Sequence, residues 1–433
     1  MSSSLRSGFG VLRHRSFSFY LSAKLLATLA VQMQSVAIGW QVYAISGDVF
    51  DLGLIGLAQF LPFLFLILPA GQVADRHNRR NVIAGCFAIE LLCAALLLGF
   101  TLLSLQTLWP VFAVLALFGV ARAFAMPSQQ AIIMNLVPAE DFGQAVALSS
   151  STFHVAVIAG PALGGVLYLA GPGTVYALVA IILLLSLVLM LRIHSKQELR
   201  PPTGDAWHEL LEGLRFVRTR PVVLGAISLD LFAVLFGGAV ALLPAYARDV
   251  LHAGPIGLGL LRTAPAVGAA LTALALVYWP ITRRVGPWMF GGVAVFGLAT
   301  IVLGSTEHFA IALAALVLTG AGDMVSVYIR HVLVQFETPD EIRGRVSAVS
   351  AVFIGASNEL GEFESGATAG WFGLRPAIVI GGIATLGVTV LWTRLFPVLR
   401  KMDRFPHVQR NEVPATVATA GLPSLAQPSA SSA

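Results

Sequence analysis

The sequence predicts an all-α integral membrane protein of about twelve transmembrane helices, arranged as two six-helix repeats. Of its 433 residues, 57% are hydrophobic and 11% are charged, whereas a soluble protein carries about 25% charged residues. The apolar runs are long and continuous, as in Tyr176–Leu191 and Ala377–Trp392. Such runs fit bilayer-spanning helices of about 20 residues, and they lack the alternating pattern of β-barrel strands.

The apolar runs also give the order of the helices. We expect helices over residues 17–45, 50–70, 81–104, 108–130, 143–170, 174–193, 222–249, 256–279, 287–305, 308–331, 344–371 and 375–397. Arginines gather in alternate connections, and the opposite ones hold little more than Arg248 and Arg375. Because Lys and Arg in short loops mark the cytoplasmic side, both termini are expected in the cytoplasm.

One long polar connection in the interior divides the chain into two halves. The last segment is rich in Ala, Pro, Ser and Thr, a composition typical of disorder. We therefore expect a cytoplasmic N-terminal segment (1–16), a first six-helix bundle (17–193), a cytoplasmic linker (194–221), a second six-helix bundle (222–397) and a disordered cytoplasmic tail (398–433).

An internal repeat supports the two halves. Pro138 and Pro339 lie in similar stretches, NLVPAEDFGQAV and FETPDEIRGRVS, and they are 201 residues apart (339 minus 138). The same shift relates scattered identities without a gap: Gly119 to Gly320, Ala147 to Ala348, Gly160 to Gly361 and Gly165 to Gly366. A constant shift of this kind indicates duplicated six-helix units.

A short charged turn lies between the second and third expected helices. It contains Gly71, Asp75, Arg76, Arg79 and Arg80 in the pattern G-x-x-x-D-R-x-x-R-R. The pattern resembles the signature loop of the major facilitator superfamily of secondary transporters. The resemblance implies two bundles related by an axis along the membrane normal, with substrate bound between them. It also implies that this loop controls conformational switching. A degenerate copy follows the eighth expected helix at 282–284.

The fifth expected helix contains a second motif, with Gly160, Pro161, Gly164 and Gly165. Proline removes a helix hydrogen bond and kinks the helix, while glycines permit close helix packing; either effect alone can be purely structural. The motif resembles the antiporter signature of exporting branches of the superfamily. In the second repeat Glu362 stands where the proline is expected, which suggests that this helix was adapted for charge.

The N-terminal half narrows the resemblance further, to the enterobactin-exporter-like branch. Members of that branch are similar to drug:proton antiporters, and some export siderophores. The resemblance extends to about Phe396. The residues that carry it are Phe17, Phe19, Gln34, Ala37–Trp40, Tyr43, Leu52, Gly53, Gln59–Pro62 and Ala74–Arg76.

Ionisable residues inside membrane helices are costly and mark functional sites by default. Glu359 and Glu362 are three residues apart and share a helix face, where burial and mutual repulsion favour uptake of a proton by one of them. Asp230 and Asp323 are further candidates for proton coupling. Alternatively, these acids bind a cationic part of the substrate without titrating.

Arg122 is the candidate cation of the central cavity. Because Arg122 and Asp323 occupy the same site in the two repeats, 201 residues apart, we expect them to pair across the two-fold axis. The sequence places a further arginine, Arg262, near the external end of its helix.

These observations predict a secondary active transporter in the cell inner membrane. It exports a small amphipathic, siderophore-like or drug-like molecule by proton antiport with alternating access. A lysophospholipid flippase of the same fold and a non-transporting membrane sensor or scaffold remain alternatives. No P-loop, metal-ligand cluster or nucleophile elbow is present in the sequence. We therefore expect no enzyme activity, metal or cofactor, a proton gradient as energy source, membrane lipids around a monomer, and no nucleic-acid partner.

Overall fold

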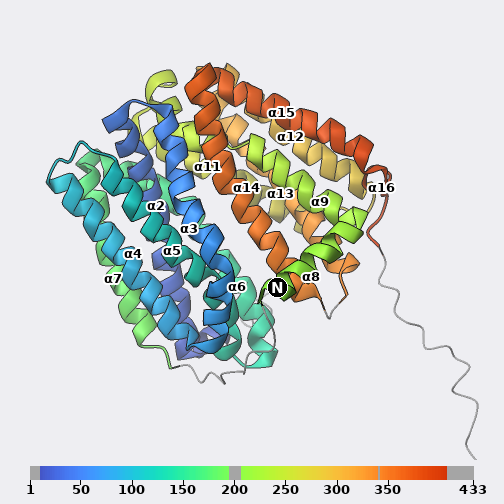
Figure 1. Cartoon of the computed structure of the whole chain (residues 1–433), viewed down its shortest axis with the longest axis horizontal. Coiled ribbons are helices and arrows are strands. Elements are labelled where there is room, and N and C mark those ends of the chain that lie inside the picture. Colours follow the sequence, from blue (N-terminus) through green and yellow to red (C-terminus); the bar gives the residue numbers. More distant parts are fainter. Residues whose placement is uncertain (1–9, 195–205, 340–341, 407–433) are drawn as a thin grey trace, which may run out of the picture.

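The computed structural model describes residues 10–194, 206–339 and 342–406. Within them, the long helices form two bundles that lie side by side (Figure 1). The first contains α2 (Arg15–Ser46), α3 (Val49–Arg76), α4 (Arg79–Leu102), α5 (Trp109–Ile132), α6 (Phe142–Leu167) and α7 (Pro172–Leu191). The second contains α9 (Pro221–Phe236), α11 (Gly254–Tyr278), α12 (Val285–Ser305), α13 (Phe309–Glu337), α14 (Arg343–Phe372) and α15 (Leu374–Leu395).

Short helices complete the described chain: η1 (Gly10–Arg13), η2 (Ile133–Asn135), η3 (Ala139–Asp141), η4 (Tyr168–Ala170), α8 (Ala206–Thr219), η5 (Ala239–Leu242), α10 (Leu243–Ala245), η6 (Tyr246–Val250) and α16 (Pro397–Arg400). Part of the expected linker is therefore helical, as α8. The tail expected to be disordered from residue 398 instead begins within α16, which extends to Arg400. Residues 407–433 of the tail, 1–9 of the N-terminal segment and 195–205 of the linker lie outside the described part.

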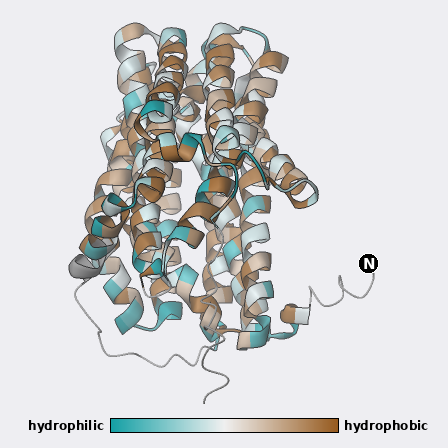
Figure 2. Ribbon diagram, turned by 90° about the vertical axis from the view of Figure 1, so that its right-hand side faces the viewer, coloured by the Kyte–Doolittle hydropathy of each residue, from teal (hydrophilic) through white to brown (hydrophobic). Residues whose placement is uncertain are grey.

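The predicted all-α membrane fold is confirmed. Eleven of the twelve long segments are long and apolar enough to cross a membrane, as the brown ribbon segments of Figure 2 illustrate. The twelfth, α14, has 30 residues but carries Glu359, Glu362 and Glu364 within its length. Its charges therefore set it apart from the other spans.

The seventh span differs from the continuous helix expected over 222–249. Helix α9 ends at Phe236, and the chain continues through short turns to the π-helix η6. A side chain at Gly237 would lie 2.1 Å from Phe296, and one at Gly238 would lie 2.5 Å from the carbonyl oxygen of Gly361. These two glycines let α12 and α14 approach the break closely.

Two helix pairs join the bundles: α3 packs along α14, and α6 packs along α11. Glycines make both seams tight. A Cβ at Gly366 would lie 2.5 Å from the Cα of Gly53, and a Cβ at Gly259 would lie 3.2 Å from the Cα of Gly165. Both contacts lie near the starts of α3 and α11, away from the Asp75–Arg80 turn. We call this the far end of the molecule, and the end that bears the turn the loop end.

Polar contacts between the bundles also favour the far end. The Tyr43 hydroxyl donates to the Asp249 carboxylate, and the Arg248 guanidinium donates to the carbonyl oxygen of Tyr43 at 3.4 Å while covering its ring. Deeper in, Arg262 donates to the Ser35 hydroxyl at 3.0 Å. Towards the loop end, α3 and α14 diverge (Figure 1). The structure is thus closed at the far end.

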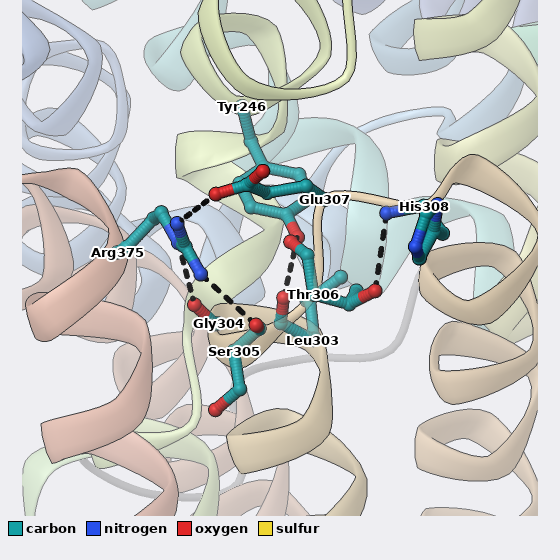
Figure 3. A network of polar contacts seen from close by, with 8 residues as sticks. All are labelled: Tyr246, Leu303, Gly304, Ser305, Thr306, Glu307, His308 and Arg375. Carbon is teal, nitrogen blue, oxygen red and sulfur yellow. Dashed lines mark hydrogen bonds and ion pairs between the residues drawn. The ribbon is translucent and has the colours of Figure 1, made fainter.

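A polar network anchors the far end of the second bundle (Figure 3). Arg375, at the start of α15, donates to the carbonyl oxygens of Gly304 at 3.2 Å and Ser305 at 2.9 Å, and pairs with Glu307. The Tyr246 hydroxyl bonds the carbonyl oxygen of Thr306 at 2.6 Å. These bonds satisfy the carbonyl groups left open where α12 ends and hold η6, which carries Asp249, in a fixed position.

Candidate functional site

The charged turn holds the ends of two helices of the first bundle, α5 and α7. Arg79 donates to the side-chain oxygen of Asn135 at 2.9 Å and to the carbonyl oxygen of Ala131 at 3.2 Å, both where α5 ends. Arg80 donates to the last carbonyl groups of α7, at Met190 (3.3 Å) and Leu191. Arginines stabilise such carboxyl ends through the exposed carbonyl groups and the helix dipole.

The remaining residues of the turn are less engaged. Asp75 has a side chain that is 72% exposed, and its carboxylate lies 3.5 Å from Arg79. Arg76 is exposed, and a Cβ at Gly71 would meet no atom within 4 Å. In this conformation the turn therefore contacts its own bundle through Arg79 and Arg80, while Gly71 and Asp75 leave space for another surface.

The degenerate copy of the turn, at 282–284, also contacts an acidic side chain. Arg283 lies 3.6 Å from the carboxylate of Asp403, and the same carboxylate accepts from the backbone N–H of Arg284 at 3.2 Å. The copy contains no aspartate, and Asp403, which follows α16, provides the carboxylate instead. Sequence analysis did not foresee this partner, because it is more than a hundred residues away.

An ion pair connects the two bundles near the middle of their helices. The Arg122 guanidinium of α5 binds the Glu359 carboxylate of α14 and covers the Phe63 ring of α3, 5.6 Å from its centroid. Arg122 is 42% exposed, whereas the Glu359 side chain is 9% exposed. The expected pair between Arg122 and Asp323 is therefore wrong, because Glu359 takes the position within reach of Arg122.

Glu362 lies one turn further along α14, against α3. Its carboxylate Oε2 would be 2.9 Å from a Cβ at Gly56, a position that only glycine leaves open. Three charged residues act on Glu362: Arg122 of α5, Arg262 of α11 and Glu359 of its own helix. Among the described residues, Glu362 has no hydrogen bond or ion pair. It is thus a carboxylate between two cations with unused acceptor capacity.

Arg262 completes this inter-bundle site from α11. Its Nη1 donates to Ser35 of α2 at 3.0 Å, and its buried Nε has no hydrogen-bond partner in the described structure. Arg122, Arg262, Glu359 and Glu362 together carry two positive and two negative charges. We call these four residues the inter-bundle site.

Asp230 and Asp323 lie apart from this site, inside the second bundle. Asp230 of α9 pairs with Arg330 of α13, with 2.6 Å between Oδ2 and Nη1 and both side chains buried. Asp323 lies seven residues before Arg330, on the same face of α13, and interacts electrostatically with both. Sequence analysis missed Arg330, although its seven-residue spacing from Asp323 was a usable signal.

The motif on α6 packs against two helices. A Cβ at Gly160 or Gly164 would meet Gln32 at 2.4 Å or the carbonyl oxygen of Met33 at 2.8 Å, both on α2. A Cβ at Gly165 would lie 2.5 Å from the carbonyl oxygen of Pro255, at the start of α11. Helix α6 continues through Pro161. The motif thus places Gly165 on the seam between the bundles.

Two six-helix bundles with charged residues between them at mid-depth define a secondary transporter of the major facilitator superfamily. A sequence profile described as "transmembrane secretion effector" matches residues 6–422. The chain belongs to that family. In the residues described, no group of three His, Cys, Asp or Glu side chains is arranged to hold a metal ion.

Relatives of this chain are also named as transporters. The chain is 25% identical over 402 residues to the enterobactin exporter EntS of Citrobacter koseri, covering 90% of this chain and 94% of the relative. The enterobactin exporter EntS of Shigella boydii gives the same identity and coverage. These relatives are transporters, which agrees with the prediction that the chain is not an enzyme.

Solved structures share the fold. A bacterial homologue of the human lysosomal transporter Spinster, in an inward-facing and unoccupied conformation, has a TM-score of 0.67 at 15% identity and covers 89% of this chain and 96% of its own. A POT family transporter in complex with 5-aminolevulinic acid has a TM-score of 0.71 at 11% identity, with 89% and 97% covered. At these identities the likeness shows the fold alone.

Proposed function

We propose that the chain exports a small amphipathic, siderophore-like molecule from the cytoplasm across the inner membrane, in exchange for protons. The observation that carries the proposal is the inter-bundle site: an ion pair that spans the two bundles, next to a carboxylate, Glu362, that has no hydrogen-bond partner among the described residues. The similarity to enterobactin exporters supports export as the direction and a siderophore as the substrate class.

The orientation follows from the arginines. The loop end carries Arg76, Arg79 and Arg80, and the connections there are richer in Arg and Lys than those of the far end. Since such loops stay in the cytoplasm, we assign the loop end to the cytoplasm. The structure, closed at the far end, then represents an inward-facing state that receives substrate from the cytoplasm.

Competition for one carboxylate explains the exchange. A substrate with hydroxyl or amine donors can bond the free oxygens of Glu362, whereas a proton on that carboxylate removes an acceptor and leaves the two arginines in excess. Substrate and proton then weaken each other's binding by the same factor. A site that binds either the substrate or the proton, but not both at once, performs antiport.

The ion pair between the bundles links this exchange to movement. Arg122 and Glu359 lie on different bundles, so the pair must change when the bundles rotate past each other. Proton uptake beside the pair lowers the negative charge that holds Arg122. We assign Glu362 the role of proton carrier and the Arg122–Glu359 pair that of the switch that senses it.

Inside-out vesicles from a bacterial host that lacks its enterobactin exporter test the proposal. With the chain expressed and the lumen acidified, enterobactin should accumulate inside, and a protonophore should stop the accumulation. Glu362→Gln should abolish uphill accumulation, whereas Glu364→Gln, the same change two residues along α14, should preserve it. Accumulation that survives the protonophore would contradict proton antiport. Transfer of lysophospholipid but not of enterobactin would instead support the flippase alternative.

A further inference from the structure

Lys24 of α2 is a charged residue that lies outside the inter-bundle site. Its ammonium group donates a hydrogen bond to the Ser149 hydroxyl of α6 at 2.7 Å. Among the described residues Lys24 forms no ion pair, and no other charged group acts on it. An ammonium group has three donors, so two of them are available to a ligand or to water. A charge inside a membrane helix that lacks an acidic partner indicates a functional role.

The bond to Ser149 distinguishes Lys24 from a lysine that extends to the lipid headgroups. Lys24 is partly exposed, whereas Ser149 is 2% exposed. Ser149 also interacts with the hydroxyl of Tyr20, which donates to the carbonyl oxygen of Gln129 on α5 at 2.8 Å. Contacts with α5 and α6 therefore fix the position of the ammonium group inside the first bundle, whereas a snorkelling side chain extends along its own helix into water.

The face of α2 that contains Lys24 is the face that meets the second bundle. Lys24 and Ser35 are eleven residues apart, which is about three helical turns, so they share one face. At Ser35 this face accepts the hydrogen bond from Arg262, and a Cβ at Gly39, one turn further, would lie 3.0 Å from Pro244. Lys24 lies on the same face towards the loop end, where the bundles diverge (Figure 1). It therefore faces the side on which the bundles separate.

We propose that Lys24 binds an acidic oxygen group of the substrate, such as a carboxylate or an ionised phenol, and that Ser149 positions the ammonium group. The proposal rests on the proposed export and names its substrate class, an amphipathic anion that enters from the loop end. An acidic oxygen suits the ammonium better than a carbonyl oxygen, because charge-assisted hydrogen bonds are about twice as strong as neutral ones. The four charges of the inter-bundle site sum to zero, so Lys24 supplies the net positive charge.

Lys24 and the inter-bundle site lie at different depths. Eleven residues of α2 correspond to about 16 Å, and this distance separates Lys24 from the level of Ser35 and Arg262. A substrate that comes from the loop end meets Lys24 first. Selection for charge and exchange with protons therefore take place at different residues, and each can be changed without the other.

Binding of two matched probes to the purified full chain, measured by isothermal titration calorimetry, tests the proposal. Naphthoate is a small amphipathic acid, and naphthamide is an uncharged molecule of nearly the same size. The unsubstituted chain should bind naphthoate more tightly than naphthamide. Lys24→Met should weaken naphthoate binding about 10-fold or more, as expected for a lost hydrogen bond to a charged group, and should leave naphthamide binding unchanged. Lys24→Arg should keep the preference for naphthoate.

Arg15→Met is the matched control. Arg15 is exposed and precedes Lys24 by nine residues on the same helix, which places it on the opposite face. Its loss removes the same charge and should leave both affinities unchanged. Ser149→Ala should reduce the preference for naphthoate by a smaller factor, because the ammonium group keeps its charge but loses its fixed position. An unchanged preference in Ser149→Ala would overturn the positioning role even if Lys24→Met did not fold.

The outcomes separate this proposal from the proposed function. Equal affinities for the two probes, or a preference for naphthoate that persists in Lys24→Met, would overturn the binding role of Lys24, whatever Glu362→Gln does to proton exchange. A preference lost in Lys24→Met, together with enterobactin transport that moves no protons, would uphold Lys24 and remove proton antiport. Binding of lysophosphatidylglycerol that depends on Lys24, with no binding of naphthoate, would assign Lys24 to a lipid phosphate and overturn its assignment to a substrate acid.

Discussion

The glycine seam at the far end gives the sharpest test of how the two bundles meet. We expect Gly366→Ala to destabilise the closed far end, because its Cβ would lie 2.5 Å from the Cα and 2.7 Å from the N of Gly53. Both atoms are backbone, so a bundle must shift. Gly370→Ala, one turn along α14, is the matched control, because its Cβ would lie 3.6 Å from Phe50, an ordinary contact.

The size of the effect follows from the overlap. Forcing one extra methyl group into a packed interface costs about 1–3 kcal/mol, which corresponds to a change of about 5- to 150-fold in the ratio of two conformations. Gly366→Ala should therefore shift the population from the far-end-closed state to a far-end-open state. Gly370→Ala should leave the ratio nearly unchanged.

Distances between spin labels at the far end provide the measurement. Labels on Leu103 of the first bundle and Trp371 of the second fall on exposed positions, and both native cysteines, Cys86 and Cys93, are buried. Gly366→Ala should increase the fraction of long distances, and Gly370→Ala should not. Equal distance distributions in the two variants would refute the tight seam as the element that holds the far end closed.

Further outcomes follow from individual contacts. Tyr43→Phe removes the hydrogen bond to Asp249, worth about 0.5–1.5 kcal/mol, and should increase the far-end-open fraction of the same label pair; an unchanged fraction would exclude this bond as a gate. Arg330→Met leaves Asp230 buried without its partner, so the unfolding temperature in detergent should fall by the equivalent of about 3–5 kcal/mol, and adding Asp230→Asn should restore part of it. Asp75→Asn should reduce transport and leave substrate affinity nearly intact; lost binding with normal turnover would contradict a switching role for the turn.

The sequence was sufficient for the fold because hydropathy reports directly on burial in lipid. Long apolar runs locate the helices, and the constant shift of 201 residues indicates the repeat. The break after Phe236 was not predicted, since Gly237 and Gly238 signal it only once Phe296 and Gly361 are seen to press on them.

Three residues of the inter-bundle site, Arg122, Glu359 and Glu362, were predicted from the sequence, whereas Arg262 and the pairing of the charges were not. Arg122 and Asp323 are equivalent by sequence, but internal symmetry relates positions and does not bring side chains within reach of each other. Arg330 was not among the predicted residues, and the helix expected over 308–331 would end next to it, whereas α13 continues to Glu337. Those additional turns place Arg330 inside the bundle, where it meets Asp230.

Proton movement driven by substrate tests the central proposal most directly. The purified chain is reconstituted in liposomes that contain a pH-sensitive dye, with no gradient imposed, and enterobactin is added to one side. Proton antiport predicts a change of lumenal pH that follows the enterobactin gradient, is present in Glu364→Gln and is lost in Glu362→Gln. Enterobactin transport with no change of lumenal pH, or an equal change in both variants, would contradict it.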